Sequence, residues 1–321
     1  MCFKYTVYGL TLQANHSLPN LISASDNASV DIWVELNGKS QQSSTDVDNL
    51  SSGINIKSKS DGTYFHLWFH GDGKIDFEID ATGCHISASW VILTIEEVTT
   101  LLLGQVLGCA LRLRGTLCLH ACVLKVGEQA IAIVGESGAG KSTTAAALSK
   151  RGHAILSDDI AVLSEVDQYW FVQPGYPRLR LWPQSIQALY GSEDNLSRIL
   201  SFSEKRFINL NDSETTEWQF HNKPLPLAAI YILGKRQLNL ATPMIEAVPS
   251  KNAVLALMKH RTLNHLPLDK EKQAQEFAAI SRVVVDVPVR KVNRRDSLDA
   301  LPQICDAILE DLRNFLAVDK D

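Results

Sequence analysis

The feature that most constrains this chain is a glycine-rich segment between an apolar run and a helix-forming run. Residues 131–134 are Ile-Ala-Ile-Val, residues 135–142 read Gly-Glu-Ser-Gly-Ala-Gly-Lys-Ser, and residues 144–150 favour a helix. The order Gly-x-x-x-x-Gly-Lys-Ser is that of a phosphate-binding loop between a strand and a helix. The sequence therefore predicts a strand, an anion-binding loop and a helix, in that order.

The residue types of this loop match the chemistry of a nucleoside triphosphate. Glycines let backbone N–H groups face an anion, and the helix that begins near Lys141 directs its positive dipole end to the same place. Lys141 supplies a cation for the outer phosphates, and the Ser142 hydroxyl can reach Mg²⁺. We expect ATP as the donor, with GTP as the alternative because the loop does not read the base. The predicted nucleotide-binding residues are Gly135, Glu136, Ser137, Gly138, Ala139, Gly140, Lys141, Ser142 and Thr143.

Composition and charge narrow the class of protein. The chain has 321 residues, of which 45% are hydrophobic and 21% are charged, as expected for a globular protein with a sizeable core. Its length suggests two domains, or one large domain with an appendage. The net charge of -5 gives no reason to expect nucleic acid or a membrane as a partner. Six scattered cysteines without a Cys-x-x-Cys pair, and an N-terminus without a signal-peptide pattern, predict a cytoplasmic location.

Hydrophobic patterning divides the chain into two regions. Residues 1–92 are expected to be β-rich: residues 30–36 alternate between apolar and polar, and residues 63–69 and 74–79 flank a hairpin turn. Residues 93–321 contain the phosphate-binding loop and form the expected second domain.

The strand order around the loop predicts an α/β domain with a mixed sheet. Residues 116–126 form an apolar strand, and the turn at 127–128 leads directly into the loop strand, so these two strands should be antiparallel. A doubly wound nucleotide fold would have a parallel neighbour, entered through a helix. The valine-rich run at 283–287 is expected to be a further strand.

Candidate reactive residues lie close to the loop in sequence. His120 lies on the preceding strand, and Asp158 and Asp159 end the short strand that follows the loop helix. Acidic residues in such a position hold the metal in phosphoryl-transfer sites. The alternatives are that His120 is an ordinary core histidine and that Asp158 and Asp159 form a solvated turn. Cys118 and Cys122 share one strand face with His120, but ligands at this spacing suit tetrahedral zinc poorly, so small buried cysteines are preferred.

Basic residues downstream are candidates for contacts with phosphate or acceptor. Arg178 and Arg180 share one face of a predicted strand, and a planar guanidinium suits phosphate oxygens. Lys205 and Arg206 could belong to an acceptor-binding loop. The basic run 290–295 is either a solvated face or a docking site for an acidic peptide.

Taken together, these motifs resemble a known family. The combination of 119–121, 135–142, 151–153 and 157–159 resembles the catalytic core of HPr serine kinase/phosphorylases. That core is shared with ATP-dependent phosphoenolpyruvate carboxykinases. The β-rich N-terminal region, together with residues 176–183, is more similar to the shorter HPr-kinase-related proteins found with ribosomally made peptides, including lasso peptide kinases.

The resemblance implies a fold, a reaction and roles for single residues. It implies an HPr-kinase-like catalytic domain over residues 93–321 and transfer of the γ-phosphoryl group of ATP to a Ser hydroxyl of a peptide or small protein. Asp158 and Asp159 would divide two tasks, one orienting or deprotonating the acceptor and the other holding Mg²⁺, with the assignment open. The implied catalytic residues are Asp158, Asp159, His120, Lys141 and Arg180, and the implied metal ligands are Ser142, Asp158 and Asp159. HPr kinases are hexamers, so a homo-oligomer is compatible with the resemblance.

Three other functions fit parts of the pattern. A nucleotide-binding regulator would bind ATP without transfer, which the intact Asp pair disfavours. A phosphate-loop hydrolase would consume ATP without an acceptor. A kinase could also act on a small-molecule hydroxyl, because residues 186–321 contain no readable recognition pattern for the acceptor.

Overall fold

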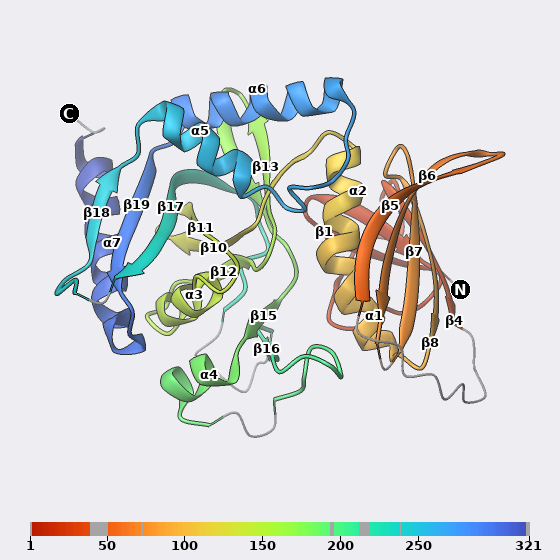
Figure 1. Ribbon diagram of the computed structural model, residues 1–321, viewed down its shortest axis with the longest axis horizontal. Coiled ribbons are helices and arrows are strands. Elements are labelled where there is room, and N and C mark those ends of the chain that lie inside the picture. Colours follow the sequence, from red (N-terminus) through yellow and green to blue (C-terminus); the bar gives the residue numbers. More distant parts are fainter. Residues whose placement is uncertain are drawn as a thin grey trace.

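In a computed structural model, the chain forms two large sheets separated by one long helical segment (Figure 1). The structure describes residues 2–38, 51–71, 73–192, 196–211, 219–237 and 239–318. The mixed α/β class predicted from the sequence is confirmed by this arrangement.

The first sheet comes from the β-rich N-terminal region. Its strands are β1 (Phe3–Val7), β2 (Leu10–Ala14), β3 (Ile22–Ser23), β4 (Ile32–Gly38), β5 (Ser51–Lys59), β6 (Gly62–His70), β7 (Lys74–Asp80) and β8 (His85–Val91). They follow the order β3-β1-β2-β4-β8-β7-β6-β5. β4 is parallel to both of its neighbours, and the hairpin predicted at 63–79 is the antiparallel pair β6–β7.

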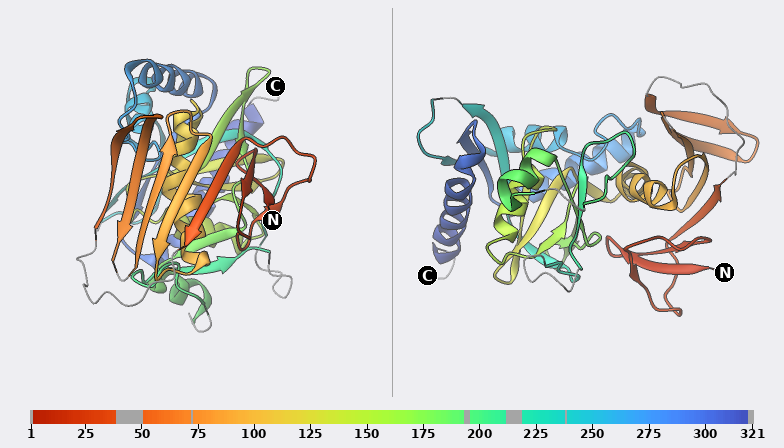
Figure 2. Two further views of the ribbon diagram at one scale, coloured as in Figure 1. Left: turned by 90° about the vertical axis from the view of Figure 1, so that its right-hand side faces the viewer. Right: turned by 90° about the horizontal axis from the view of Figure 1, so that it is seen from below.

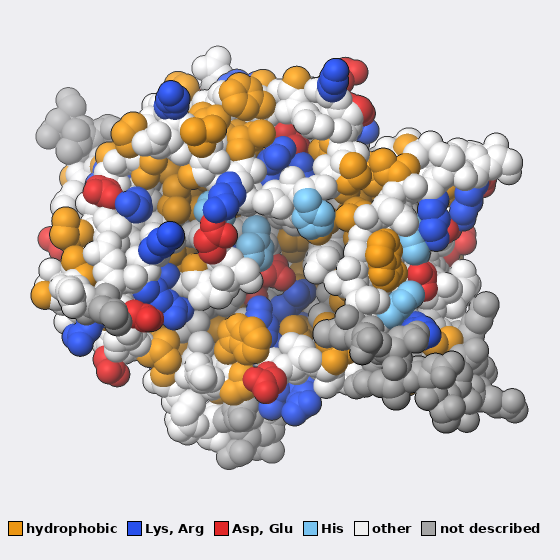
Figure 3. Space-filling model, in the orientation of Figure 1, with side chains coloured by type: hydrophobic (Ala, Val, Ile, Leu, Met, Phe, Trp, Pro, Cys, Tyr) orange, Lys and Arg blue, Asp and Glu red, His pale blue; other side chains and the backbone are white. Residues whose placement is uncertain are grey.

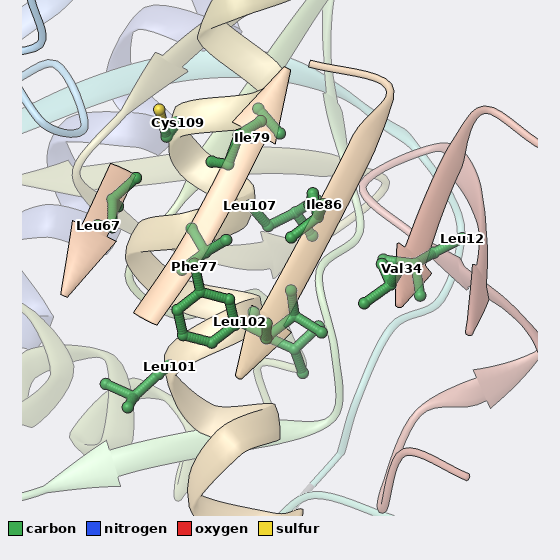
Figure 4. Close-up of a cluster of buried hydrophobic side chains, with 14 of the residues drawn as sticks. Leu12, Val34, Leu67, Phe77, Ile79, Ile86, Leu101, Leu102, Leu107 and Cys109 are labelled. Atoms are coloured by element: carbon green, nitrogen blue, oxygen red, sulfur yellow. The ribbon is translucent and has the colours of Figure 1, made fainter. Parts of the chain in front are cut away.

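The helical segment consists of α1 (Ile95–Leu101), a π-helical turn η1 (Leu102–Val106) and α2 (Leu107–Leu113). A capping box begins it, because Thr94 Oγ1 accepts from the Glu97 backbone while the Glu97 side chain accepts from the Thr94 backbone. Its apolar side chains pack on one face of the first sheet, where Leu102 and Leu107 lie near Phe77 and Ile86 (Figure 4). Each such buried side chain contributes roughly 1.5–3 kcal/mol. Figure 2 shows the strands with this segment behind them.

The segment therefore covers the N-terminal sheet although it follows residue 92. The division into domains at residues 92 and 93 stays a prediction.

The second sheet holds the phosphate-binding loop. Its strands are β9 (Leu117–Leu119), β10 (Ala121–Val126), β11 (Gln129–Val134), β12 (Ile155–Ser157), β13 (Ala161–Val166), β14 (Tyr169–Gln173), β17 (Leu225–Gln237), β18 (Met244–Ala247) and β19 (Val289–Arg295). A separate pair is formed by β15 (Arg178–Leu181) and β16 (Arg206–Asn209). As predicted, β11 is antiparallel to β10, and its other neighbour β17 is parallel.

Helices cover both faces of this second sheet (Figure 1). α3 (Lys141–Ser149) and α7 (Leu301–Val318) pack on one face, and α5 (Ser250–Lys259) and α6 (Lys270–Asp286) pack on the other. The remaining helices are α4 (Pro183–Tyr190) and the short η2 (Leu298–Ala300). None of the helices in the described ranges combines the length and the hydropathy that a bilayer-spanning helix needs.

The strand predicted at residues 283–287 is wrong, because this run is the end of α6. Asp269 caps that helix by accepting a hydrogen bond from the Lys272 backbone at 2.8 Å. Ile280 and Val283 are buried at helical spacing, whereas Val285 is 81% exposed. The helical period thus overrides the strand preference of the valines.

Candidate active site

The phosphate-binding loop has the predicted strand–loop–helix geometry. β11 ends at Val134, and α3 begins at Lys141 with Gly140 as its N-cap. Gly140 has a φ of 95°, a left-handed conformation that residues with a side chain rarely adopt. Lys141 Nζ donates to the carbonyl oxygens of Gly135 at 2.9 Å and Glu136 at 3.2 Å. Burial lowers the pKa of Lys141, although Asp158 and Asp159 partly oppose that effect.

Asp158 is fixed beneath the loop. Its Oδ1 accepts hydrogen bonds from Ser142 Oγ at 2.9 Å and from Cys122 Sγ at 2.7 Å, and its Oδ2 accepts from the Arg180 backbone at 2.9 Å. The side chain is buried, with an exposed fraction of 2%. Burial and the neighbouring Asp158 raise the pKa of Cys122 well above its usual value, so the thiol is the donor. Asp158 is therefore oriented by contacts from three separate segments.

Asp159 has a different environment from its neighbour. Its φ of 74° lies in the left-handed region, which is uncommon for a residue other than glycine and often marks a functional site. Arg180 Nη1 donates to Asp159 Oδ2 at 2.7 Å. Burial raises the pKa of Asp159, but the Arg180 guanidinium beside it outweighs burial and holds the pKa of the carboxyl below its usual value. Asp159 is therefore an ionised carboxylate on the wall of the cleft.

His120 lies in the break between β9 and β10, so the single strand predicted over 116–126 is two strands. Its Nδ1 is 3.0 Å from the Asp159 carbonyl oxygen and 3.8 Å from Asp159 Oδ1. Since a carbonyl can only accept, we assign the proton to Nδ1. Burial lowers the pKa of His120 despite the opposing charge of Asp159. The ring is thus neutral at neutral pH, with Nε2 as an acceptor.

Most of these groups line one cleft of about 820 Å³. Figure 3 shows a hollow with acidic, basic and histidine side chains on its walls. The predicted site residues that line the cleft are His120, Ser137, Gly138, Gly140, Lys141, Ser142, Thr143, Asp159 and Arg180. Gly135, Glu136, Ala139 and Asp158 belong to the loop or lie beneath it without lining the cleft.

Two further arginines also line the cleft: Arg236, which the sequence did not single out, and Arg294 of the basic run 290–295. Arg236 Nη2 donates to the Gly138 carbonyl at 3.1 Å, and Arg294 donates to the Ala139 carbonyl. Arg294 is 6% exposed, and burial together with Arg236 lowers its pKa to about 10. The basic run 290–295 therefore forms β19 and reaches the loop at Arg294. The parallel pairing of β19 with β17 sets Arg294 beside Arg236, and the basic run alone does not show this placement.

The other basic candidates differ in whether they line the cleft. Arg178 donates to Glu96 and lies 4.1 Å from the Phe207 ring centroid, away from the cleft lining. Lys205 lines the cleft and lies 5.5 Å from the ring centroid of Trp182, another lining residue.

The donor set suits magnesium. The hydroxyl of Ser142 and the carboxylate of Asp158 lie together, and Mg²⁺ takes one or two protein oxygens together with substrate phosphates and water. Within the described ranges, no three His, Cys, Asp or Glu side chains form a metal-binding group. Cys118 and Cys122 are buried in different hydrophobic clusters.

Part of this site lies in a segment that is similar to known proteins. Residues 112–175 match the family model for the HPr serine kinase C-terminal domain. An HPr kinase/phosphorylase of Clostridium botulinum is 40% identical over 79 residues, which are 24% of this chain and 26% of that protein. One from Clostridium beijerinckii is 45% identical over 49 residues, or 15% of this chain and 16% of that one.

A solved structure of the HPr(Ser) kinase/phosphatase of Coxiella burnetii is more distant, with 14% identity and a TM-score of 0.35 over 64% of this chain and 99% of that one. The predicted resemblance to HPr kinases is confirmed by the family model and the curated relatives. The matched segment spans about a quarter of the length of the botulinum relative, 26%.

Proposed function

We propose, with the HPr-kinase-like segment 112–175 as the premise, that the protein transfers the γ-phosphoryl group of ATP to a Ser hydroxyl of a peptide or small protein, with Mg²⁺. The observation that carries this proposal is the placement of Asp159 on the cleft that Lys141 and Ser142 also line. The loop proposed to bind the nucleotide and an ionised carboxylate therefore share one space. That is the arrangement phosphoryl transfer requires.

The loop would bind the donor. Its N–H groups and the α3 N-terminus would bind the β-phosphate region, and Lys141 would turn from the loop carbonyls to the outer phosphates. Ser142 and Asp158 would hold Mg²⁺, which supplies charge neutralisation at the phosphate oxygens when bound. We assign Asp158 to this task because its carboxylate is buried beside the Ser142 hydroxyl.

Asp159 would act on the acceptor. Its carboxylate accepts the proton of the Ser hydroxyl as that oxygen bonds to the γ-phosphorus, while the bond from the γ-phosphorus to the bridging oxygen breaks and ADP leaves. Arg180 keeps Asp159 ionised and oriented. His120, neutral and bonded to the Asp159 carbonyl, would place Nε2 near the incoming hydroxyl.

A protein-borne acceptor is supported by the relatives, whose names describe kinases of HPr. A ribosomally made precursor peptide, such as a lasso peptide, is the narrower form of the proposal and rests on the resemblance of the N-terminal region. A small-molecule hydroxyl is the alternative acceptor.

The test is incubation of the full chain with γ-³²P-labelled ATP, Mg²⁺ and separate acceptors. These are HPr, a pool of Ser-containing peptides, the same pool with Ser replaced by Ala, and free serine. We expect label in phosphoserine of HPr or of the Ser pool and none in the Ala pool. ATP hydrolysis at an equal rate in all samples, without labelled acceptor, would contradict the proposal and favour a hydrolase.

A further inference from the structure

The guanidinium of Arg180 is held largely by residues far from the phosphate-binding loop. Beyond its pair with Asp159, Nη2 donates to the Tyr176 hydroxyl and lies 3.4 Å from the Thr100 carbonyl oxygen. Thr100 belongs to α1, which packs on the N-terminal sheet. The helical segment that packs on the N-terminal sheet therefore contacts a side chain of the candidate active site directly.

A break in the long helical segment makes room for this contact. The π-helical turn η1 interrupts the segment at Gly104, whose φ of -88° and ψ of -105° are not helical. A Cβ at residue 104 would lie 3.5 Å from both terminal nitrogens of Arg180. An alanine would just fit, whereas any longer side chain in that direction would occupy the place of the guanidinium. Single π-helical turns are frequent at functional sites.

The tip of the first hairpin supports the same network from another side. Tyr8 and Gly9 form the β1–β2 turn, with φ of 55° and 76°. The Tyr8 backbone donates to the Pro174 carbonyl at 2.8 Å, and its ring meets that of Tyr176 edge-on, with centroids 6.5 Å apart. Tyr8 is 2% exposed, so the N-terminal sheet inserts a buried aromatic ring behind Tyr176.

We propose that the N-terminal unit, meaning the first sheet and the helical segment 95–113 packed on it, positions Arg180 for the reaction. Tyr8 acts through Tyr176, and Thr100 and Gly104 form the socket of the guanidinium. This inference rests on the proposed function for its catalytic consequence, although the socket itself is a property of the free protein. Tyr8, Tyr176 and Gly104 are positioning residues, because they act on the site through Arg180. The N-terminal unit is then a working part of the active site.

The design of the socket distinguishes it from ordinary packing. A packing contact would need only apolar complementarity, but here a hydroxyl and a carbonyl oxygen accept from the same guanidinium nitrogen. These acceptors fix the plane of Arg180 and so the direction of Nη1 toward Asp159. A misplacement of about 1 Å can cost roughly 100-fold in rate.

The test uses Gly104→Leu and Tyr176→Phe, with Tyr5→Phe as the matched control. Tyr5 is a buried tyrosine of β1 in the N-terminal sheet. Its hydroxyl accepts a hydrogen bond from the Leu18 backbone at 2.8 Å and makes no described contact with Arg180. The first readout is ¹⁵N–¹H NMR of the Arg180 guanidinium in the free protein, assigned with Arg180→Lys. The second is the kcat and KM for Mg·ATP in the transfer assay.

In the wild type and in Tyr5→Phe we expect separate, slowly exchanging Nη signals for Arg180. In Gly104→Leu they should merge, with kcat falling roughly 100-fold and KM for ATP changing less than about threefold. Tyr176→Phe, the milder variant, should lower kcat roughly tenfold, as the loss of one charge-assisted hydrogen bond implies. Gly104→Ala should have a smaller effect than Gly104→Leu.

Unchanged Arg180 signals in Tyr176→Phe and in folded Gly104→Leu would overturn the inference, whatever the transfer rates. If Gly104→Leu does not fold, Tyr176→Phe decides alone. Merged signals in both variants, together with a wild type that transfers no phosphate, would leave the socket standing and contradict the proposed function. Merged signals with an unchanged kcat would overturn the catalytic part of the inference.

Discussion

The two walls of the cleft are built in opposite ways. The nucleotide wall is one continuous segment, residues 135–143, whose conformation follows from its glycines and the helix after it. The other wall, which we call the reactive wall, brings together His120, Asp159 and Arg180 from three separate segments. The helical segment on the N-terminal sheet supports Arg180. In the proposed function, nucleotide binding would therefore be a local property of the chain, whereas the reaction would depend on how distant segments meet.

Asp158 and Asp159 show the same contrast within two residues. The Asp158 carboxylate lies beneath the loop and accepts from Ser142 and Cys122. The left-handed backbone of Asp159 turns its side chain into the cleft, where Arg180 holds it. Adjacent residues of one type thus occupy different parts of the site: Asp158 lies beneath the loop, and Asp159 lines the cleft.

Breaking the nucleotide wall should have the largest effect. Lys141→Met removes the cation of the loop, so we expect Mg·ATP affinity to fall roughly 10- to 100-fold and transfer roughly 100- to 1000-fold. Lys251→Met, an exposed lysine on α5, is the control and should behave as wild type. Isothermal titration with Mg·ATP and the transfer assay measure both quantities. Undiminished ATP binding in Lys141→Met would show that the loop is not the nucleotide wall.

Weakening the reactive wall should affect transfer alone. In Arg180→Lys an ammonium replaces the guanidinium fork that contacts Asp159, Tyr176 and Thr100. We expect transfer to fall roughly 10- to 100-fold with little change in Mg·ATP affinity. If affinity fell as much as the rate, Arg180 would belong to the nucleotide wall instead.

Two buried cysteines allow a matched comparison between packing and function. Cys122→Ala and Cys118→Ala should each lower the free energy of unfolding by about 1 kcal/mol, because both remove a buried sulfur. Only Cys122→Ala also removes a donor to Asp158, so only that variant should lower transfer, by roughly tenfold or less. Denaturant unfolding and the transfer assay test this. Equal transfer rates in the two variants would argue that the thiol does not position Asp158.

The smallest expected effect concerns the pH dependence of stability. Burial lowers the pKa of His260, although Glu136 partly opposes it. The unfolded chain, with a pKa of about 6.5, then takes up more protons than the folded one as the pH falls below about 7. The stability contribution of His260 is fully present above its ordinary pKa and is lost as the pH falls through its folded pKa. Melting temperatures from pH 8 to 5 should therefore fall less steeply for His260→Gln than for wild type or His265→Gln, an exposed control.

Local patterns predicted the geometry around residues 135–143 well. The strand–loop–helix, the antiparallel neighbour of β11 and the acidic pair each follow from a short stretch of residues. The strand predicted at 283–287 was wrong because the strand preference of valine is a local property. Helix α6 is instead stabilised by its N-cap and by the burial of one helical face.

The contacts between distant segments could be predicted only in part. Arg236 and Arg294 reach the loop through parallel strands far along the chain, and the basic run 290–295 did not show that its member Arg294 would lie there. The contact of Thr100 and Gly104 with Arg180 depends on how a helix meets a strand about 80 residues away. Likewise, two consecutive aspartates read alike in sequence, and only the left-handed φ of Asp159 separates their roles.

The most direct test of this division between binding and reaction is one variant measured in two ways. Asp159→Asn keeps the size of the side chain and the left-handed backbone, which asparagine tolerates, but removes the charge. We predict that Asp159→Asn binds Mg·ATP within about threefold of wild type and transfers phosphate to the acceptor at least 100-fold more slowly. Asp167→Asn, at another left-handed aspartate in the β13–β14 turn, should match wild type in both. Transfer by Asp159→Asn at the wild-type rate would contradict the account.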